Sequence, residues 1–466
     1  MHLLRHRLPA DLLTPLSAYL ALRGEGATLL LESADQGERV GRHSFVMMQS
    51  PGELRLHPPA KGWVEGLRSL AGAVIDPAAS LHDPEALPAG RDAMPVGVGL
   101  AGYVGFEALA ALEPSLPLPE RNSLGLPTVW ARRFDAALVF DHLHQVAELQ
   151  VLAQDPDTGF QRLRHLRQVL AQGVQDPGQG IQAQEAEPQI SREAYEAFVR
   201  RAQALIHDGD VYQLVPSQRM KVAHPPTPLA AYRRLRRLNP SPYAFLLEWE
   251  SFALVGASPE MLVRVQGGEA ETLPIAGTVP RGGSAEEDAA RFESLKRDPK
   301  ELAEHQMLVD LARNDLGRIA VPGGVRVEKP LALQRTSHVL HLTTTVKAEL
   351  KPGLDAFDVL ASAFPAGTVS GAPKLRAAQR IAEMEGDMRG PYGGALLRYG
   401  ADGALDTALI LRTAVYAQGA AWLQAGAGVV RASKPEAEYR ETLHKLGAVA
   451  EALGASLPAM AAEVAR

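Results

Sequence analysis

Two pairs of glutamates are the residues of this sequence whose spacing most directly suggests chemistry. Glu301 and Glu304 form one pair, and Glu438 and Glu441 form the other. Residues three apart share one face of a helix, so the carboxylates of each pair repel one another. A bound Mg²⁺ would relieve this repulsion, because it prefers oxygen ligands and is usually held by one or two carboxylates and several waters. A solvated charged face with lysine and arginine partners explains the same spacing without a metal, and the pairs alone leave both interpretations open.

Three glycine-rich segments could bring an anionic ligand close to the backbone. Residues 97–102 carry GxGxxG spacing, but a proline precedes them and an extended stretch follows, which favours a strand in a packed sheet over a dinucleotide site. Residues 367–374 lack the Gly-Lys-Ser/Thr ending of a phosphate-binding loop, and they form either an anion-binding turn or a simple helix start. Residues 424–430 either let a ligand approach closely or form a β-bulge.

The composition limits the classes of protein that the chain can belong to. Its 466 residues, 46% hydrophobic and 22% charged, indicate a globular protein of two or three lobes. The net charge of −6 gives no reason to expect nucleic acid or an anionic membrane as a partner, and no apolar run approaches the roughly 18 residues of a membrane span. We expect a cytoplasmic location, because the basic first residues have no apolar signal core behind them. The absence of cysteine excludes disulfides, thiolate metal sites and a cysteine nucleophile.

The elements that must position these residues point to an α+β fold, with strands grouped in hairpins more than in βαβ units. Residues 173–188, rich in Gln, Gly and Pro, are predicted to link an N-terminal lobe of residues 1–172 to a second lobe of residues 189–455, followed by a tail of residues 456–466. Ser191 is expected to cap the first helix of the second lobe. The patterns predict strands at 27–31, 136–140, 146–152, 252–255, 261–265, 339–346, 405–415 and 421–425, a hairpin of 138–141 with 145–152, and helices at 298–314, 375–384 and 435–453.

A run of short motifs between residues 190 and 450 covers over half of the chain. In type and order these motifs resemble those of the chorismate-utilising enzymes. The resemblance implies that family's fold, with largely antiparallel sheets packed as a sandwich and helices on the outside. The motifs are Gly209–Ser217, Asn239–Tyr243, Gly256–Glu260, Pro274–Gly282, Ala303–Asp315, Ser337–His341, Phe364–Lys374, Gly390–Gly394, Ile410–Thr413 and Gln424–Gly428.

The N-terminal lobe narrows the resemblance to the large subunits of anthranilate synthase. Leu30–Ser33 and Gly41–Phe45 look like the tryptophan-sensing segment of that family. There the inhibitor lies between this segment and the stretch that is Pro242-Tyr243-Ala244 in this chain. The resemblance therefore implies a tryptophan site containing Ser33, Pro242, Tyr243 and Ala244.

Two positions separate the sister activities of this fold. Isochorismate and salicylate synthases carry a lysine base, which activates water, where this chain has Gln213. Aminodeoxychorismate synthases typically carry a lysine where this chain has Ala276. With neither lysine, the resemblance implies that ammonia attacks C2 of chorismate. The sister chemistries, and a tryptophan-binding regulatory protein without catalysis, are the alternatives that identification of the product would decide between.

The resemblance gives the paired glutamates a role at a magnesium ion. Glu304 and Glu441 would contact Mg²⁺, and Glu301 and Glu438 would support it mainly through water. The metal would bind the ring carboxylate of chorismate and act as a Lewis acid. The spacing of the glutamates does not by itself establish this role.

The resemblance also implies an acid and a set of substrate contacts. His341 would protonate the departing C4 hydroxyl as general acid, and Thr368 would orient His341 and that hydroxyl. Tyr392 and Arg412 would bind the enolpyruvyl carboxylate, and the backbone amides of residues 426–428 would bind a further carboxylate. The implied chorismate-binding residues are Glu260, Gly277, Thr278, Tyr392, Arg412, Gly426, Ala427, Gly428 and Lys445.

A partner follows from the same resemblance and from the missing cysteines. The chain cannot cleave glutamine with a cysteine of its own, so ammonia would come from a glutamine amidotransferase subunit. The implied assembly is a heterotetramer of two large and two small subunits, which performs the first committed step of tryptophan biosynthesis under tryptophan feedback. His444 and Thr336 depart from the usual asparagine and aromatic residue, and His444 could alter the helix that carries Glu441.

Overall fold

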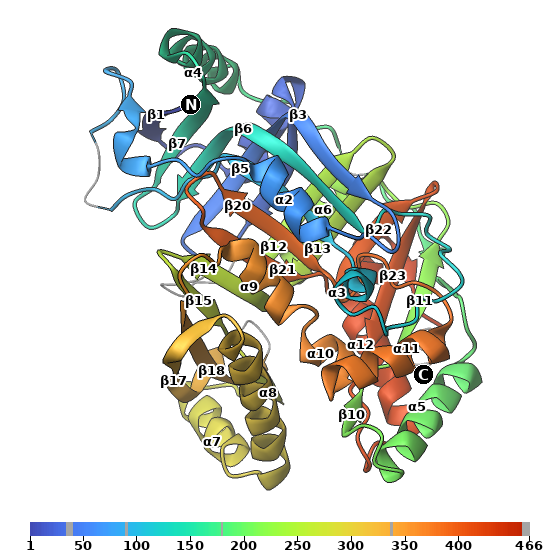
Figure 1. The fold of residues 1–466 in the computed structure, drawn as a ribbon. Helices are drawn as coiled ribbons and strands as arrows, with labels where there is room; N and C mark the ends of the chain where they lie inside the picture. The colour runs from blue at the N-terminus through green and yellow to red at the C-terminus, as the bar shows by residue number, and fades with distance from the viewer. Residues whose placement is uncertain (34–40, 89–91, 179, 336–338, 459–466) are drawn as a thin grey trace.

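The computed structural model describes residues 1–33, 41–88, 92–178, 180–335 and 339–458. As predicted, the fold is α+β: twenty strands form one largely antiparallel network, and helices lie on its outside (Figure 1). The helices are α1 (Pro15–Leu22), α2 (Trp63–Ala71), α3 (Leu109–Leu112), α4 (Pro156–Ala171), α5 (Arg192–His207), α6 (Pro228–Leu238), α7 (Ala285–Leu295), α8 (Pro299–Gly317), α9 (Ala356–Ala363), α10 (Gly367–Ser370), α11 (Lys374–Glu385) and α12 (Pro435–Ala452). Among the helices of these ranges, none is long and apolar enough to cross a membrane.

The strands run the whole length of the described chain. The first group is β1 (His2–Pro9), β2 (Ala27–Glu32), β3 (His43–Leu56), β4 (Leu81–His82), β5 (Gly99–Val104), β6 (Val129–Asp141), β7 (Val146–Ala153), β8 (Gln184–Glu185), β9 (Glu187–Pro188), β10 (Gln213–Leu214), β11 (Ser217–Val222) and β12 (Tyr243–Trp249). The second group is β13 (Phe252–Ser258), β14 (Met261–Gln266), β15 (Glu269–Thr272), β16 (Ile275–Pro280), β17 (Ala320–Arg335), β18 (Val339–Leu350), β19 (Gly371–Ala372), β20 (Ala395–Gly400), β21 (Leu405–Leu409), β22 (Thr413–Ala417), β23 (Ala420–Gly426) and β24 (Ala455–Ser456).

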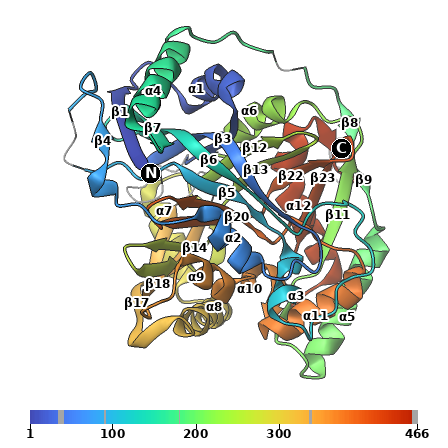
Figure 2. The same ribbon diagram turned by 45° about the horizontal axis from the view of Figure 1, so that its top comes forward.

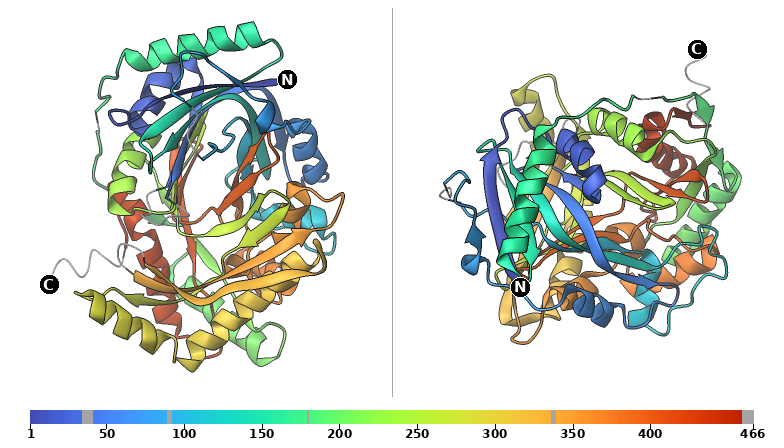
Figure 3. Two further views of the ribbon diagram at one scale, coloured as in Figure 1. Left: turned by 90° about the vertical axis from the view of Figure 1, so that its left-hand side faces the viewer. Right: turned by 90° about the horizontal axis from the view of Figure 1, so that it is seen from above.

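Both faces of the central strands are buried. Successive side chains of a strand point to opposite faces, and in β12 Phe245 and Leu247 join one apolar cluster while Leu246 joins another. Trp130 of β6 and Phe252 of β13 meet across the interior, with ring centroids 5.1 Å apart. The strands therefore pack face to face as the expected sandwich, and helices cover its outer faces (Figures 2 and 3).

Strands from the two sides of the predicted linker pair with one another. Strand β2 pairs with β12, and β5 pairs with β20, so segments before residue 173 and after residue 188 share the same sheet. Within the predicted linker, β8 pairs with β24 and β9 pairs with β11. The predicted linker therefore contains two short strands that pair with later strands of the chain before α5 begins.

One group of elements stands apart at the lower left of Figure 1. Strands β15 to β18 form a hairpin sheet there, and helices α7 and α8 pack on it around Phe292, Leu295, Leu340 and Leu342. The helix predicted from residue 298 begins at Pro299, and Asp298 caps it by accepting the N–H groups of Lys300 and Glu301. This group carries Glu301 and Glu304, whereas α12 carries Glu438 and Glu441 against α5, α6 and β23.

The predicted elements are present, with one clear error. Ser191 caps α5 by accepting the N–H of Ala194, and β6 and β7 form the expected hairpin. The single strand predicted over residues 405–415 is wrong, because β21 ends at Leu409 and β22 begins at Thr413. Arg412 has a φ of 48° between them, and this left-handed conformation interrupts the ladder. Thr336 and the pair Ser337-His338, named above, lie outside the described residues.

Candidate active site

A partly buried carboxyl group, that of Glu260, lies where β13 leads into β14. The hydroxyl of Thr368, in α10, donates a hydrogen bond of 2.8 Å to Glu260 Oε1. Burial raises the pKa of Glu260 to about 7, although the Thr368 hydrogen bond and the positive charges of Lys445 and Arg412 act to lower it. A carboxyl with this pKa exchanges a proton near neutral pH, so Glu260 can act as an acid or a base.

His341 lies on β18 opposite Thr278 of β16. Its Nδ1 is 3.1 Å from Thr278 Oγ1 and 3.3 Å from the carbonyl oxygen of Gly277. Burial lowers the pKa of His341, and the charge of Arg412 lowers it further, so the imidazole is neutral at pH 7. The expected partner was Thr368, but its hydroxyl binds Glu260, and the hydroxyl beside His341 is that of Thr278.

A bend at Gly277 brings this strand against α8. Gly277 has a φ of 67°, and the pairing of β16 with β18 shifts register between Ala276 and Thr278. A β-carbon at Gly277 would come within 3.2 Å of Glu301 Oε2, and the positive φ favours glycine at this position. Burial raises the pKa of Glu301, and the charge of Glu304 adds to the rise. The predicted ring-site residues of β16 therefore lie next to one carboxylate pair.

The second carboxylate pair lies beside Lys445 on α12. Lys445 Nζ donates to the carbonyl oxygen of Gly426 at 3.0 Å and is 2.8 Å from Glu441 Oε1. Burial raises the pKa of Glu438, and Glu441 raises it further, while Lys445 and Lys300 lower it. Because Lys300 belongs to α8, its influence on Glu438 means that the two acidic helices face the same space.

The four glutamates do not converge into one metal cage. Among the residues that the structure describes, no three His, Asp or Glu side chains lie close enough together to hold a metal ion. The donors themselves fit Mg²⁺, since they are carboxylates without thiolates, and in each pair burial first and then the like-charged neighbour raise the pKa of one glutamate, Glu301 or Glu438. The chemistry of the four carboxylates therefore fits the ion, and the two pairs lie on different helices, α8 and α12.

The glycine-rich end of β23 is packed more tightly than the sequence suggests. A β-carbon at Gly426 would come within 3.0 Å of the Tyr392 hydroxyl, and one at Gly428 would come within 2.9 Å of Gln213 Nε2. The N–H of Ala427 donates to the carbonyl oxygen of Pro216 at 3.3 Å. The fold therefore already uses this donor, and the contact of the Ala427 amide with a substrate carboxylate stays a prediction.

Arg412 supplies the cationic group of the site. Its left-handed backbone is held by a hydrogen bond of 3.2 Å from the N–H of Ala257 to its carbonyl oxygen. The guanidinium makes no hydrogen bond or ion pair with any residue in the described part of the chain. Burial lowers the pKa of Arg412, and Glu260 opposes this shift. A partly buried guanidinium with unused donors is suited to a carboxylate ligand.

All four residues of the predicted tryptophan site lie around one cavity. Ser33, Pro242, Tyr243 and Ala244 line a cavity of about 530 Å³, counting the space open to solvent. They meet because β2 and β12 are neighbours, with Glu32 paired to Ala244. The sequence patterns did not indicate its polar wall, which consists of Arg264, Arg398 and Asp406.

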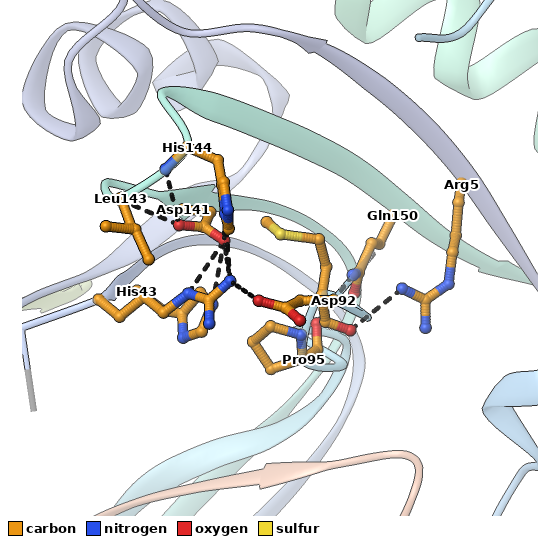
Figure 4. A network of polar contacts seen from close by, with 10 residues as sticks. Arg5, His43, Asp92, Pro95, Asp141, Leu143, His144 and Gln150 are labelled. Carbon is orange, nitrogen blue, oxygen red and sulfur yellow. Dashed lines mark hydrogen bonds and ion pairs between the residues drawn. The ribbon is translucent and has the colours of Figure 1, made fainter. Parts of the chain in front are cut away.

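His43 also lines this cavity, and a polar network at the β6–β7 turn holds the residue before it, Arg42. Burial lowers the pKa of His43 to about 4, so its ring is neutral, and its Nε2 is buried without a hydrogen-bond partner among the described residues. The Asp141 carboxylate accepts hydrogen bonds from the N–H groups of Leu143 and His144. It also forms an ion pair with Arg42, the residue before His43 (Figure 4). This network anchors the start of β3 and thereby one wall of the cavity.

Comparisons with known proteins agree with this geometry. A family model described as "chorismate binding enzyme" matches residues 27–451. Anthranilate synthase component 1 of Thermus thermophilus is 42% identical over 454 residues, covering 95% of this chain and 96% of that protein. The same component of Pseudomonas putida is 39% identical over 468 residues, covering 95% and 93%.

Solved structures show the same relationship. Anthranilate synthase component I of Streptococcus pneumoniae superposes with a TM-score of 0.77 at 31% identity, covering 95% of this chain and 98% of that one. A menaquinone-specific isochorismate synthase of Escherichia coli superposes with a TM-score of 0.71 at 19% identity, covering 97% and 94%. The second likeness concerns the fold alone.

Proposed function

Because the chain belongs to the chorismate binding enzyme family, we propose that it converts chorismate and ammonia to anthranilate and pyruvate. Its relatives over nearly the whole length are components 1 of anthranilate synthase. The observation that carries the proposal is the partly buried Glu260 carboxyl, whose pKa near 7 arises beside Thr368 and the cations Arg412 and Lys445. Such a site suits an anionic substrate that must lose a hydroxyl group with the help of a proton.

In this proposal Glu260, in place of His341, is the proton donor to the departing C4 hydroxyl. A carboxyl with a pKa of about 7 is partly protonated at neutral pH, whereas burial keeps the His341 imidazole neutral. Thr278 and Gly277 hold Nδ1 of His341, so Nε2 is the ring atom that we assign to substrate contact. In this proposal His341 orients the leaving group, and Thr368 tunes the donor.

Arg412 and Tyr392 would hold the enolpyruvyl carboxylate of chorismate. The Arg412 guanidinium has unused donors in a partly buried position, and an arginine fork matches a carboxylate in geometry. Burial raises the pKa of Tyr392 to about 12, so its hydroxyl keeps its proton and can donate a hydrogen bond. Lys445 adds positive charge on the same side through its contact with Gly426.

A magnesium ion would complete the site. Glu304 and Glu441 would hold it, and Glu301 and Glu438 would support them, as their raised pKa values favour a nearby cation. When bound, Mg²⁺ would polarise the ring carboxylate of chorismate as a Lewis acid.

Ammonia would come from a partner subunit, and feedback control would come from a cavity of this chain apart from the catalytic residues. The chain has no cysteine for cleaving glutamine, and the name of its relatives, component 1, implies a second component, which we propose is a glutamine amidotransferase subunit. A heterotetramer of two subunits of each kind is the assembly to test. The cavity that contains Ser33, Pro242, Tyr243 and Ala244 would bind tryptophan as the inhibitor.

Product identification tests the proposed function. Purified chain would be incubated with chorismate, Mg²⁺ and ammonium at alkaline pH, and the products would be separated and quantified. We expect anthranilate and pyruvate in equal amounts, formed only when ammonium is present. Isochorismate, salicylate or 4-amino-4-deoxychorismate as the product would overturn the proposal, and tryptophan binding without turnover would indicate a regulatory protein instead.

A further inference from the structure

Arg389 is a fully buried cation in the segment between α11 and β20. Its side chain is 1% exposed, and its guanidinium makes four hydrogen bonds. Two go to the carboxylate of Glu385, from Nε at 2.9 Å and from Nη2 at 2.6 Å. The other two go to backbone carbonyl oxygens, from Nη1 to Val369 and from Nη2 to Val215, each at 2.7 Å.

Both carbonyl groups belong to segments that carry predicted site residues. Val369 follows Thr368, whose hydroxyl binds Glu260. Val215 lies two residues after Gln213, whose amide nitrogen faces Gly428. One guanidinium therefore joins α10 to the chain that begins with β10, although these segments are far apart in the sequence.

The same guanidinium supports an aromatic residue of the site. Its carbon lies 5.4 Å from the ring centroid of Tyr392 and 4.6 Å from that of Phe106. The Tyr392 hydroxyl reaches Gly426 at the end of β23. A cation against a ring face is attracted by the ring quadrupole, so Arg389 restrains the plane of Tyr392 as well as the two backbone segments.

Two buried glutamates hold Arg389 in place. Glu385 Oε1 also accepts the N–H and the hydroxyl of Ser217, at 2.8 and 2.9 Å, and Ser217 pairs with Gly426. Glu107 accepts the backbone N–H groups of Arg389 and Gly390, at 2.6 and 3.0 Å. The charge is thus paired and its donors are used, which is the condition under which a buried cation persists.

A buried ion pair of this kind contributes little to stability compared with apolar residues of similar size. Its contribution is to orient the groups that it binds. The planar guanidinium fixes several acceptors at once, whereas lysine is a point charge. Two acceptors of this fork, the carbonyl oxygens of Val369 and Val215, belong to the segments that carry Thr368 and Gln213. The geometry points to a role in the reaction in addition to a role in the core.

We propose that Arg389 is a positioning residue for the chorismate site: its contacts with the Val369 and Val215 carbonyls and with the Tyr392 ring set the relative places of Thr368, Gln213 and Tyr392. The inference rests on the proposed function for the identity of the substrate. It concerns how these three residues are aligned, and it holds for any chorismate product that the enzyme forms.

The test compares Arg389→Ala and Arg389→Lys with a matched control, Arg5→Ala. Arg5 is also buried, at 6% exposure, and is paired with Glu148 at 2.7 Å, but it lies on β1, at the upper left of Figure 1, away from α10 and α12. Each variant would be characterised by its melting temperature, by kcat, by KM for chorismate, and by the same constants with millimolar guanidinium chloride.

We expect both Arg389 variants to raise KM for chorismate about tenfold and to lower kcat about a hundredfold, as misplacement of binding groups by about 1 Å does. Guanidinium should restore part of the kcat of Arg389→Ala. Arg5→Ala should lose a comparable amount of melting temperature with unchanged KM and no response to guanidinium. If Arg389→Ala does not fold, Arg389→Lys provides the same KM and kcat comparison.

The positioning role would be overturned if Arg389→Lys kept the wild-type KM for chorismate. It would also be overturned if activity fell in parallel with the melting temperature in the variants of both Arg389 and Arg5. Product identity is measured in the same reactions. A wild-type product other than anthranilate would refute the proposed function, while the change in KM for chorismate would still decide the role of Arg389.

Discussion

The hydroxyl of Thr368 donates a hydrogen bond of 2.8 Å to the carboxyl of Glu260, across 108 positions of sequence. The contact joins α10 to the turn between β13 and β14. It stabilises the ionised form of a carboxyl that burial would otherwise keep protonated, and the pKa of Glu260 results from both effects. The proton donor of the proposed mechanism is therefore tuned by a residue of a different element.

Removing this hydrogen bond should shift the pH dependence of turnover. In Thr368→Val the ionised carboxylate loses a donor, so the pKa of Glu260 rises above about 7. If protonated Glu260 is the active form, activity falls as pH rises through this pKa, and the basic limb of the kcat profile moves to higher pH. Thr368→Ser keeps the hydroxyl and should retain the wild-type profile. Identical profiles for the valine and serine variants would separate Thr368 from the titration of Glu260.

Glu260→Gln should lower activity and raise stability. Loss of the acid should reduce kcat by about a hundredfold or more. Because the pKa of Glu260 is raised from 4.5 to about 7, the native state binds more protons than the unfolded chain between these pH values, and stability falls as pH rises through this window. The glutamine variant lacks this penalty, which is about 3 kcal/mol at most. Denaturant unfolding at pH 5 and pH 8 would measure it; an equal pH dependence in both proteins would contradict the assignment.

The paired glutamates should control the magnesium requirement. Glu304→Gln and Glu441→Gln each remove a proposed ligand, and we expect the apparent affinity for Mg²⁺ to fall about a hundredfold or more. Titration calorimetry with Mg²⁺ would detect this independently of turnover. Glu436→Gln is the control, because Glu436 lies on the same helix with its carboxylate 2.6 Å from Arg440. A similar loss in the control, or unchanged affinity in the ligand variants, would remove the metal from these positions.

The cavity lined by Ser33 should control inhibition by tryptophan without affecting catalysis. Ser33→Leu adds a branched side chain to the wall shared with Pro242, Tyr243 and Ala244, and overfilling of a packed site should weaken tryptophan inhibition at least about tenfold. The kcat without tryptophan should stay near the wild-type value. Ser69→Leu, at an exposed position of α2, is the control for adding leucine. Inhibition as strong as in the wild type would refute the proposed site.

Local patterns were enough to predict some elements of this fold, among them the helices α5, α8, α11 and α12. Ser191 caps α5 as predicted because a cap uses only the next few N–H groups, and the β6–β7 hairpin follows from alternation around one turn. The missing cysteines and the identity of Gln213 and Ala276 are also properties of sequence alone. These features depend on residues within a few positions of one another, or on composition.

The alignment of the site was decided only by the tertiary structure. The left-handed turn at Arg412 and the pairing of His341 with Thr278 in place of Thr368 differ from expectation, and the contact of the Ala427 amide with Pro216 was not expected. Each involves a register shift, a turn or a partner set by elements distant in sequence. The pKa of Glu260 likewise depends on how deeply other elements bury it, and burial is a property of the packed chain that no local pattern encodes.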